Sequence, residues 1–192
     1  MTEKKAERLR KKIKRIKLDL AADKRRWGGF YDDSRGLRYL PPQFYVKLGD
    51  FDGGLKYFRW FNKNFPDDIG FPEFLFEWTI ILFKKGKIKE AEKKAFETYC
   101  RNTYIFDKFF DRPIVPIDKY TFAFSGGPEY TNHFIYSSKD HTLADFTEWL
   151  DSYTKTIKFK TSSQKYVEIE RRLKTEDDVE TRGYLIDQAL QL

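Results

Sequence analysis

The sequence predicts a mostly α-helical protein, and three observations support this fold class. Apolar residues recur at spacings of three and four along most of the chain, which is the period of a helix with one buried face. Glycine and proline residues interrupt these stretches where helices would end and begin. Hydrophobic residues make up 40% of the 192 residues and charged residues 35%, enough for one core and a solvated surface. We therefore expect residues 1–192 to form a single domain.

Residues 1–26 are predicted to form a basic amphipathic helix. They contain twelve Lys or Arg residues and four acidic ones, whereas the other 166 residues contain 25 basic and 26 acidic ones. The local balance is +8 here and −1 elsewhere, so all of the excess positive charge lies in this helix. Its apolar residues form one stripe: Ala6, Leu9, Ile13, Ile16 and Leu20. Gly28, Gly29 and the polar residues 32–36 predict a loop after it.

Two short helices are predicted next. The pair Pro41-Pro42 fits the first turn of a helix that ends at Gly49. Asp50 can cap the following helix, which stops before Pro66. The apolar stripe of this second helix is Leu55, Phe58, Phe61 and Phe65.

These residues resemble part of a tetratricopeptide repeat (TPR). The carrying motifs are Leu48-Gly49-Asp50-Phe51, Gly54-Leu55, Tyr57-Phe58 and Pro66-Asp67-Asp68, with a second copy in Gly86-Lys87-Ile88-Lys89-Glu90-Ala91 followed by Ala95. The two turn glycines are 37 residues apart, against a family period of about 34. The chain departs from the family in its proline pair, in Gly54 where alanine is usual, and in lacking a closing proline in the second copy. The resemblance covers about residues 37–101 and implies a degenerate, TPR-like helical core over residues 37–110.

In TPR-like proteins the first helices of the repeats line a concave groove. By this resemblance Tyr45, Trp78 and Leu82 would lie near such a groove and contact a partner. The helix around residues 74–83 is apolar on more than one side, so we expect it at the centre of the fold. In the helix after Gly86, residues Ile88, Ala91, Ala95 and Tyr99 are expected to face inward.

Residues 111–137 depart from the helical pattern. Pro113 and Pro116 exclude a regular helix, and Tyr120, Phe122 and Phe124 alternate with smaller residues up to a Ser-Gly-Gly turn. Two readings remain open: a short β-hairpin or an irregular, ordered loop.

Residues 138–192 are predicted to return to helices. One apolar stripe consists of Leu143, Phe146, Leu150, Tyr153 and Ile157, and another segment is centred on Tyr166, Ile169 and Leu173. Thr175 and Asp178 resemble a capping box at the start of the last helix. The buried face of that helix is predicted to be Val179, Ile186, Ala189 and Leu190.

The residue types that carry catalysis are sparse. His133 and His141 have no metal-ligand spacing, and we interpret them as isolated loop or cap histidines, although a hydrolase site with Asp140 or an acid pair is an alternative. The pairs Asp32-Asp33, Asp67-Asp68 and Asp177-Asp178 stand where helix caps are expected. Cys100 is interpreted as a structural thiol. We expect no enzyme activity, no metal and no cofactor.

The compartment is also indicated by composition. With one cysteine the chain cannot form an internal disulfide, which favours a reducing, cytoplasmic location. The sequence contains no apolar run of the length of a membrane span or a signal peptide.

The predicted function is a non-catalytic adaptor that binds a protein or peptide in a helical groove. The alternative is nucleic-acid binding through the basic helix, where the cations would meet phosphates or an acidic partner. The residues proposed for that contact are Arg8, Lys11, Lys12, Lys14, Arg15, Lys17, Arg25 and Arg26. A weaker candidate surface has Lys155, Lys158, Lys160 and Lys165 interleaved with Phe159 and Tyr166.

Overall fold

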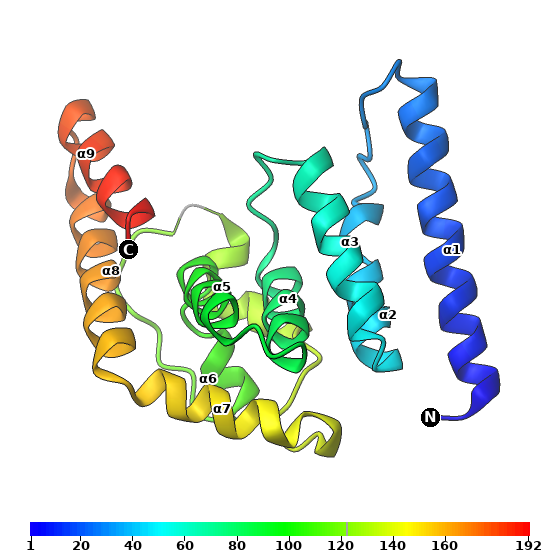
Figure 1. The fold of residues 1–192 in the computed structure, drawn as a ribbon. Helices are drawn as coiled ribbons and strands as arrows, with labels where there is room; N and C mark the ends of the chain where they lie inside the picture. Colours follow the sequence, from blue (N-terminus) through cyan, green and yellow to red (C-terminus); the bar gives the residue numbers. More distant parts are fainter. Residues whose placement is uncertain (122) are drawn as a thin grey trace. The chain divides into compact units, whose positions relative to one another are not determined.

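The computed structural model describes residues 1–121 and 123–192, and these residues are mostly helical (Figure 1). Over these two ranges there is no strand, and no helix is long and apolar enough to cross a membrane. The chain divides into two compact units, residues 1–91 and 92–192, with the boundary inside helix α5 (Ile88–Arg101). Each unit is described by itself.

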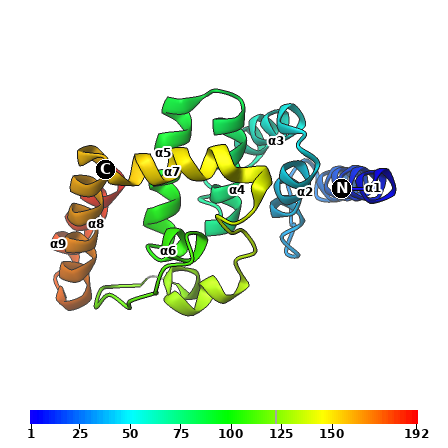
Figure 2. The same ribbon diagram turned by 90° about the horizontal axis from the view of Figure 1, so that it is seen from below.

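The first unit begins with the long helix α1 (Glu3–Arg26), which lies beside α2 (Pro41–Leu48) in both ribbon views (Figures 1 and 2). Four apolar residues of α1 are buried: Ala6, Ile13, Ile16 and Leu20. Leu9 is half-buried. The helix is therefore fixed on the unit by the apolar stripe that its spacing predicts.

The connection between α2 and α3 (Phe51–Asn64) has the local chemistry of a tight helix–helix turn. Gly49 has a φ of +69°, a left-handed conformation that glycine adopts without a steric penalty. Asp50 then caps α3 by accepting a hydrogen bond of 2.8 Å from the backbone N–H of Gly53. The predicted helix end and cap are both confirmed.

Helix α3 packs closely on α4 (Pro72–Lys84). A methyl group added at Gly54 would lie 2.5 Å from Cδ1 of Ile81, so only glycine allows the observed approach of the two helices. Beside this crossing the Phe58 ring stacks on Trp78, with centroids 4.2 Å apart and planes inclined by 6°. These contacts hold α3 closely against α4.

A hydrogen-bond network fixes the segment between α1 and α2, including the short 3-10 helix η1 (Leu37–Tyr39). The buried carboxylate of Asp33 accepts hydrogen bonds from the backbone N–H groups of Leu37 and Arg38 and from the Arg38 guanidinium. Arg38 Nε also donates to Asp68 at 2.7 Å, as does the Tyr39 hydroxyl at 2.6 Å. Burial acts to raise the pKa of Asp68, but these donors outweigh it and hold the pKa below its usual value.

Among the described residues of the second unit, seven helical segments follow α5. They are α6 (Ile105–Phe109), the 3-10 helices η2 (Phe124–Gly126), η3 (Pro128–His133) and η4 (His141–Leu143), α7 (Ala144–Lys155) and α8 (Ile157–Thr175), and the chain closes with α9 (Val179–Leu190). Helices α8 and α9 lie side by side. The α7–α8 junction is capped by Thr156, whose hydroxyl accepts a hydrogen bond from the Phe159 N–H.

The glycine turn of residues 125–127 forms 3-10 turns, and the β-hairpin reading is not seen in the described part of residues 111–137. Nδ2 of Asn102 donates to the carbonyl oxygens of Ser125 (2.8 Å) and Gly127 (2.9 Å). Because a side chain from the end of α5 satisfies these carbonyls, the turn needs no partner strand. Phe122, one of the three aromatics of the predicted alternation, lies outside the described residues.

Three expectations for the C-terminal helices are wrong. Asp178 caps α9 by itself, accepting from the Thr181 N–H at 2.8 Å, while Thr175 is the last residue of α8. Ile157 begins α8 and is 85% exposed.

The third error concerns the buried face of α9, which is Leu185 with Ala189; Ala189 was predicted, but Val179, Ile186 and Leu190 of the predicted stripe are exposed. Leu185 is fully buried in a cluster with Ile169 and Leu173 of α8. The exposed apolar residues of α9 include Val179, Ile186 and Leu190. This helix has two apolar rows, and α8 packs on only one of them.

Candidate functional site

The three residues expected to line a groove are all buried. Tyr45 and Leu82 have 4% and 3% of their surface exposed, and Trp78, stacked on Phe58, has 8%. Lys17 covers Tyr45, since its Nζ lies 5.5 Å from the ring centroid. These side chains thus contribute to the core and present little surface to a partner.

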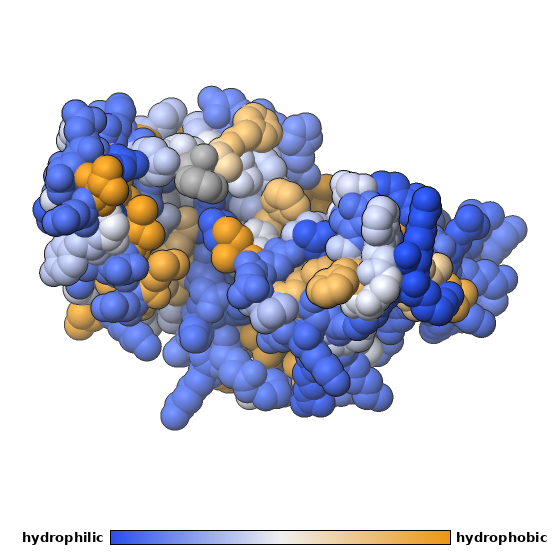
Figure 3. Space-filling view, turned by 90° about the horizontal axis from the view of Figure 1, so that it is seen from above, coloured by the Kyte–Doolittle hydropathy of each residue, from blue (hydrophilic) through white to orange (hydrophobic). Residues whose placement is uncertain are grey.

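The outward face of α1 is the largest concentration of exposed charge identified in the first unit. Lys4, Arg8, Lys11 and Arg15 are exposed and follow one another at spacings of four, three and four residues, which places them on one stripe. This stripe lies opposite the buried one, so it points into solvent. Figure 3 shows mainly hydrophilic surface over α1, at the right of the view.

The acidic residues of α1 neutralise only part of this charge. Arg10 pairs with Glu3 at 2.7 Å and Lys11 with Glu7 at 3.2 Å. Over the described residues, several exposed cations of the helix have no carboxylate within 4.0 Å: Lys4, Lys5, Arg8, Lys14, Arg15, Arg25 and Arg26.

Two of the eight predicted contact residues have a different role. Nζ of Lys12 lies 5.6 Å from the Phe44 ring centroid, and Nζ of Lys17 lies over the rings of Tyr45 and Tyr57. These cation–π contacts attach α1 to the helices beneath it. All eight predicted residues are nevertheless exposed, and Lys4 and Lys5 join them on the same helix.

The end of α1 carries two exposed aromatic residues that the sequence interpretation missed. Trp27 is 51% exposed and Phe30 is 79% exposed, with Arg25 and Arg26 immediately before them. The available signal was a Trp-Gly-Gly-Phe segment directly after a basic run.

The α8 surface differs from α1 in this respect. Lys158, Lys160 and Lys165 are exposed, but the interleaved Phe159 and Tyr166 have only 6% and 9% of their surface exposed. Phe159 and Tyr166 therefore provide no exposed ring beside these lysines on which a base could stack.

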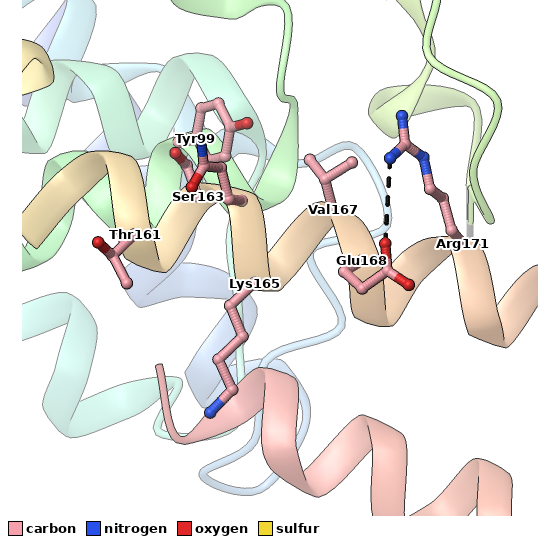
Figure 4. Close-up of a pocket in the computed structure, with 8 residues that line it drawn as sticks. Tyr99, Thr161, Ser163, Lys165, Val167, Glu168 and Arg171 are labelled. Atoms are coloured by element: carbon pink, nitrogen blue, oxygen red, sulfur yellow. Dashed lines mark ion pairs between the residues drawn. The ribbon is translucent and has the colours of Figure 1, made fainter.

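An open pocket of about 610 Å³ lies along α8 in the second unit, lined by Tyr99, Thr161, Ser163, Gln164, Lys165, Val167, Glu168 and Arg171. In Figure 4, Tyr99 and Ser163 lie on one side of α8, and Lys165 extends from the other side, away from them. Glu168 and Arg171 form an ion pair at 4.0 Å. Since the lining side chains do not converge, the pocket brings together no nucleophile and base.

Cys100 belongs to a buried group of titratable residues in the second unit. Burial raises the pKa of its thiol to about 12, with a further contribution from the negative charge of Glu170. Burial also lowers the pKa of Lys119 and raises that of Glu170. A thiol with a raised pKa is protonated at neutral pH and is a poor nucleophile. Cys100 is therefore better suited to a structural role than to nucleophilic catalysis.

The remaining candidates for catalysis lie apart from any described pocket. His133 and His141 are both exposed, and the described residues contain no group of three His, Cys, Asp or Glu side chains that could hold a metal ion. In each aspartate pair the second residue accepts a backbone N–H: Asp33 from Leu37 and Arg38, Asp68 from Gly70, and Asp178 from Thr181. Of the three, only Asp178 is a helix cap, as predicted; Asp33 and Asp68 accept N–H groups in turns, and the caps of η1 and α4 are other residues.

No protein-family model, curated protein or solved structure matches this chain. The function is therefore argued from the exposed surfaces described above.

Proposed function

We propose that the protein binds nucleic acid through the basic face of α1. The single observation that carries this proposal is the exposed stripe of Lys4, Arg8, Lys11 and Arg15, opposite the buried stripe of the same helix. Cations arranged along a rod attract a polyanion along its length, because each phosphate contact releases condensed counterions. A cytoplasmic location is part of this proposal.

The docking of α1 supports the proposal in a second way. Its apolar residues are buried in the unit, and Lys12 and Lys17 lie over aromatic rings below it. The exposed cations are therefore held at fixed spacing before a ligand arrives, which reduces the entropy lost on binding. An isolated basic peptide would lack this advantage.

The proposal is tested with a variant that removes three cations of the stripe, R8Q/K11Q/R15Q. Binding to a fluorescein-labelled oligonucleotide is measured by fluorescence anisotropy at several salt concentrations between about 50 and 200 mM. We expect the affinity to fall by about tenfold or more, and the slope of log K against log salt to fall by about 2 to 3, since each lost phosphate contact removes about 0.7 to 0.9.

The matched control is K158Q/K160Q/K165Q, which removes the same charge from exposed lysines of α8. It should bind within about twofold of the wild type, because its lysines are not part of the α1 stripe. Equal losses in the two variants would mean that only net charge matters, and a wild type that binds no oligonucleotide would overturn the proposal.

A protein-contact function is a second candidate, favoured by the exposed apolar stripe of α9. Val179, Ile186 and Leu190 are 80%, 46% and 79% exposed and are spaced by seven and four residues, the spacing with which two helices pair. We propose a second copy of α9 as the occupant, because such a stripe can pair with itself in a two-fold dimer. Sedimentation equilibrium of the wild type and of V179S/I186S/L190S tests this: a wild type that stays monomeric at every concentration contradicts it.

The TPR-like arrangement also remains a proposal. It is supported by the left-handed Gly49, the Asp50 cap and the close approach at Gly54, all of which lie within the quoted motifs. Gly86 of the second motif has the same left-handed conformation, with a φ of +69°. The adaptor groove predicted from this resemblance gains no support from Tyr45, Trp78 and Leu82, which are buried.

A further inference from the structure

We propose that Trp27 and Phe30 form a stacking platform for unpaired bases, so that the preferred ligand is single-stranded nucleic acid. This inference rests on the proposed function, because the phosphates are held by α1. It adds which form of nucleic acid is bound and where the bases lie.

The platform is built by a compact turn at the end of α1. The backbone N–H of Gly29 donates to the carbonyl of Lys24 at 2.8 Å, and the N–H of Phe30 donates to the carbonyl of Trp27 at 3.2 Å. Gly28 and Gly29 have φ values of +61° and +103°, which side-chain-bearing residues adopt rarely. The turn therefore keeps the two rings at one end of the basic helix.

The turn is anchored by the residues around it. Oδ2 of Asp23 accepts hydrogen bonds from the N–H groups of Asp32 (2.8 Å) and Asp33 (3.3 Å). Next to Phe30, Tyr31 turns inward: its ring packs on those of Trp60 and Phe65, with centroids 5.9 and 4.7 Å away. Trp27 and Phe30 are thus exposed by a fixed turn that packs the adjacent aromatic, Tyr31, against Trp60 and Phe65.

The charges around the platform suit a phosphate backbone. Arg25 and Arg26 are exposed, and the guanidinium carbon of Arg26 lies 5.8 Å from the Trp27 ring centroid. The carboxylate of Asp23 is occupied by the two backbone N–H groups, while that of Asp32 is exposed in the same turn. Residues 25–32 thus carry two exposed guanidinium groups and one exposed carboxylate.

Exposed rings select single strands, since the faces of bases inside a duplex are already stacked on one another. An unpaired base can place its face on Trp27 or Phe30, and such stacking tolerates any sequence. The α1 cations then follow the backbone over the length of the helix, about 35 Å at 1.5 Å per residue.

A membrane surface is the main competing ligand for a basic helix with nearby aromatics. A helix that lies in a membrane interface buries its own apolar face among the lipids. In this protein the apolar face of α1 is buried against the first unit, so that face is not available. The observations therefore favour nucleic acid.

The test compares W27A/F30A with the aromatic-retaining variant W27F/F30Y in the full chain. Each protein is titrated against a single-stranded oligonucleotide of about 16 nucleotides, the same sequence as a duplex, and anionic phospholipid vesicles. For W27A/F30A we expect a loss of about tenfold or more in affinity for the single strand, a change within about twofold for the duplex, and an unaltered salt slope. W27F/F30Y should stay within about threefold of the wild type for every ligand.

The outcomes separate this inference from the proposed function. If W27A/F30A binds the single strand as tightly as the wild type, the platform is refuted while the role of α1 stands. If it loses single strand and duplex equally, the rings serve general attachment and the selectivity is refuted. If R8Q/K11Q/R15Q binds like the wild type, the proposed function itself fails, and binding to vesicles alone would replace it with a membrane role.

Discussion

Replacing Leu20 with alanine tests whether α1 is a fixed part of the first unit, as the proposed interface requires. Leu20 is 1% exposed and lies on the buried stripe of α1. Leu18 is 59% exposed on the same helix and provides a matched control for the same substitution. Both changes place alanine in a helix interior, where its intrinsic propensity equals or exceeds that of leucine.

The expected magnitudes differ because only one side chain is buried. L20A removes buried methyl groups and leaves a cavity, which costs about 2 to 5 kcal/mol in the free energy of unfolding. With a urea m-value of roughly 1 to 3 kcal/mol/M, the unfolding midpoint should fall by about 2 M at the middle of both ranges. L18A should change the free energy of unfolding by no more than about 0.5 kcal/mol.

Urea unfolding can be followed by tryptophan fluorescence in a W149F background. This substitution leaves Trp27, Trp60 and Trp78, all of which belong to the first unit, so the signal reports on that unit. Equal midpoints for L20A and L18A would refute the reasoning. They would show that α1 is a free arm whose cations have no fixed orientation.

Three further predictions follow from burial and pKa. The pKa of Asp68 in the folded protein lies below its usual value, so the ionised carboxylate stabilises the fold at pH values above the usual pKa. This stabilisation is lost as the pH falls through the lowered, native pKa. The excess stability of the wild type over D68N in urea should therefore shrink below about pH 4, and a pH-independent difference would contradict the assignment. Cys100, whose pKa burial raises to about 12, should react with Ellman's reagent at pH 8 at least about tenfold more slowly in the native chain than in urea; equal rates would show an accessible thiolate. L185A should destabilise the second unit by about 2 to 4 kcal/mol and L190A by less than about 0.5 kcal/mol, measured by Trp149 fluorescence, and the reverse order would mean that the other face of α9 is buried.

The helix ends in the first unit could be predicted because their chemistry is local. Gly49 supplies the left-handed residue that ends α2, and the Asp50 carboxylate caps α3 within its own turn. The stripe of α1 was predictable for a related reason, since its buried apolar residues form one row at helical spacing, with Leu18 outside it. Such helix ends and stripes depend only on residues that lie close together in the sequence.

The candidate site was predictable only in part. The basic residues in the sequence showed where the positive charge is concentrated. They did not show that Lys12 and Lys17 lie over aromatic rings of the same unit. Aromatic content could not separate the buried Trp78 from the exposed Trp27, because burial depends on which helix packs on each face.

The sequence by itself determined the helical class, the helix ends around Gly49 and the concentration of positive charge in residues 1–26. Tertiary structure alone decided which of two apolar rows of α9 is buried and which aromatic residues reach solvent. The physical reason is that periodicity and capping depend on neighbours within a few residues, whereas burial depends on partners distant in sequence. Leu185 and Leu190 have the same side chain on the same helix, and only the position of α8 distinguishes them.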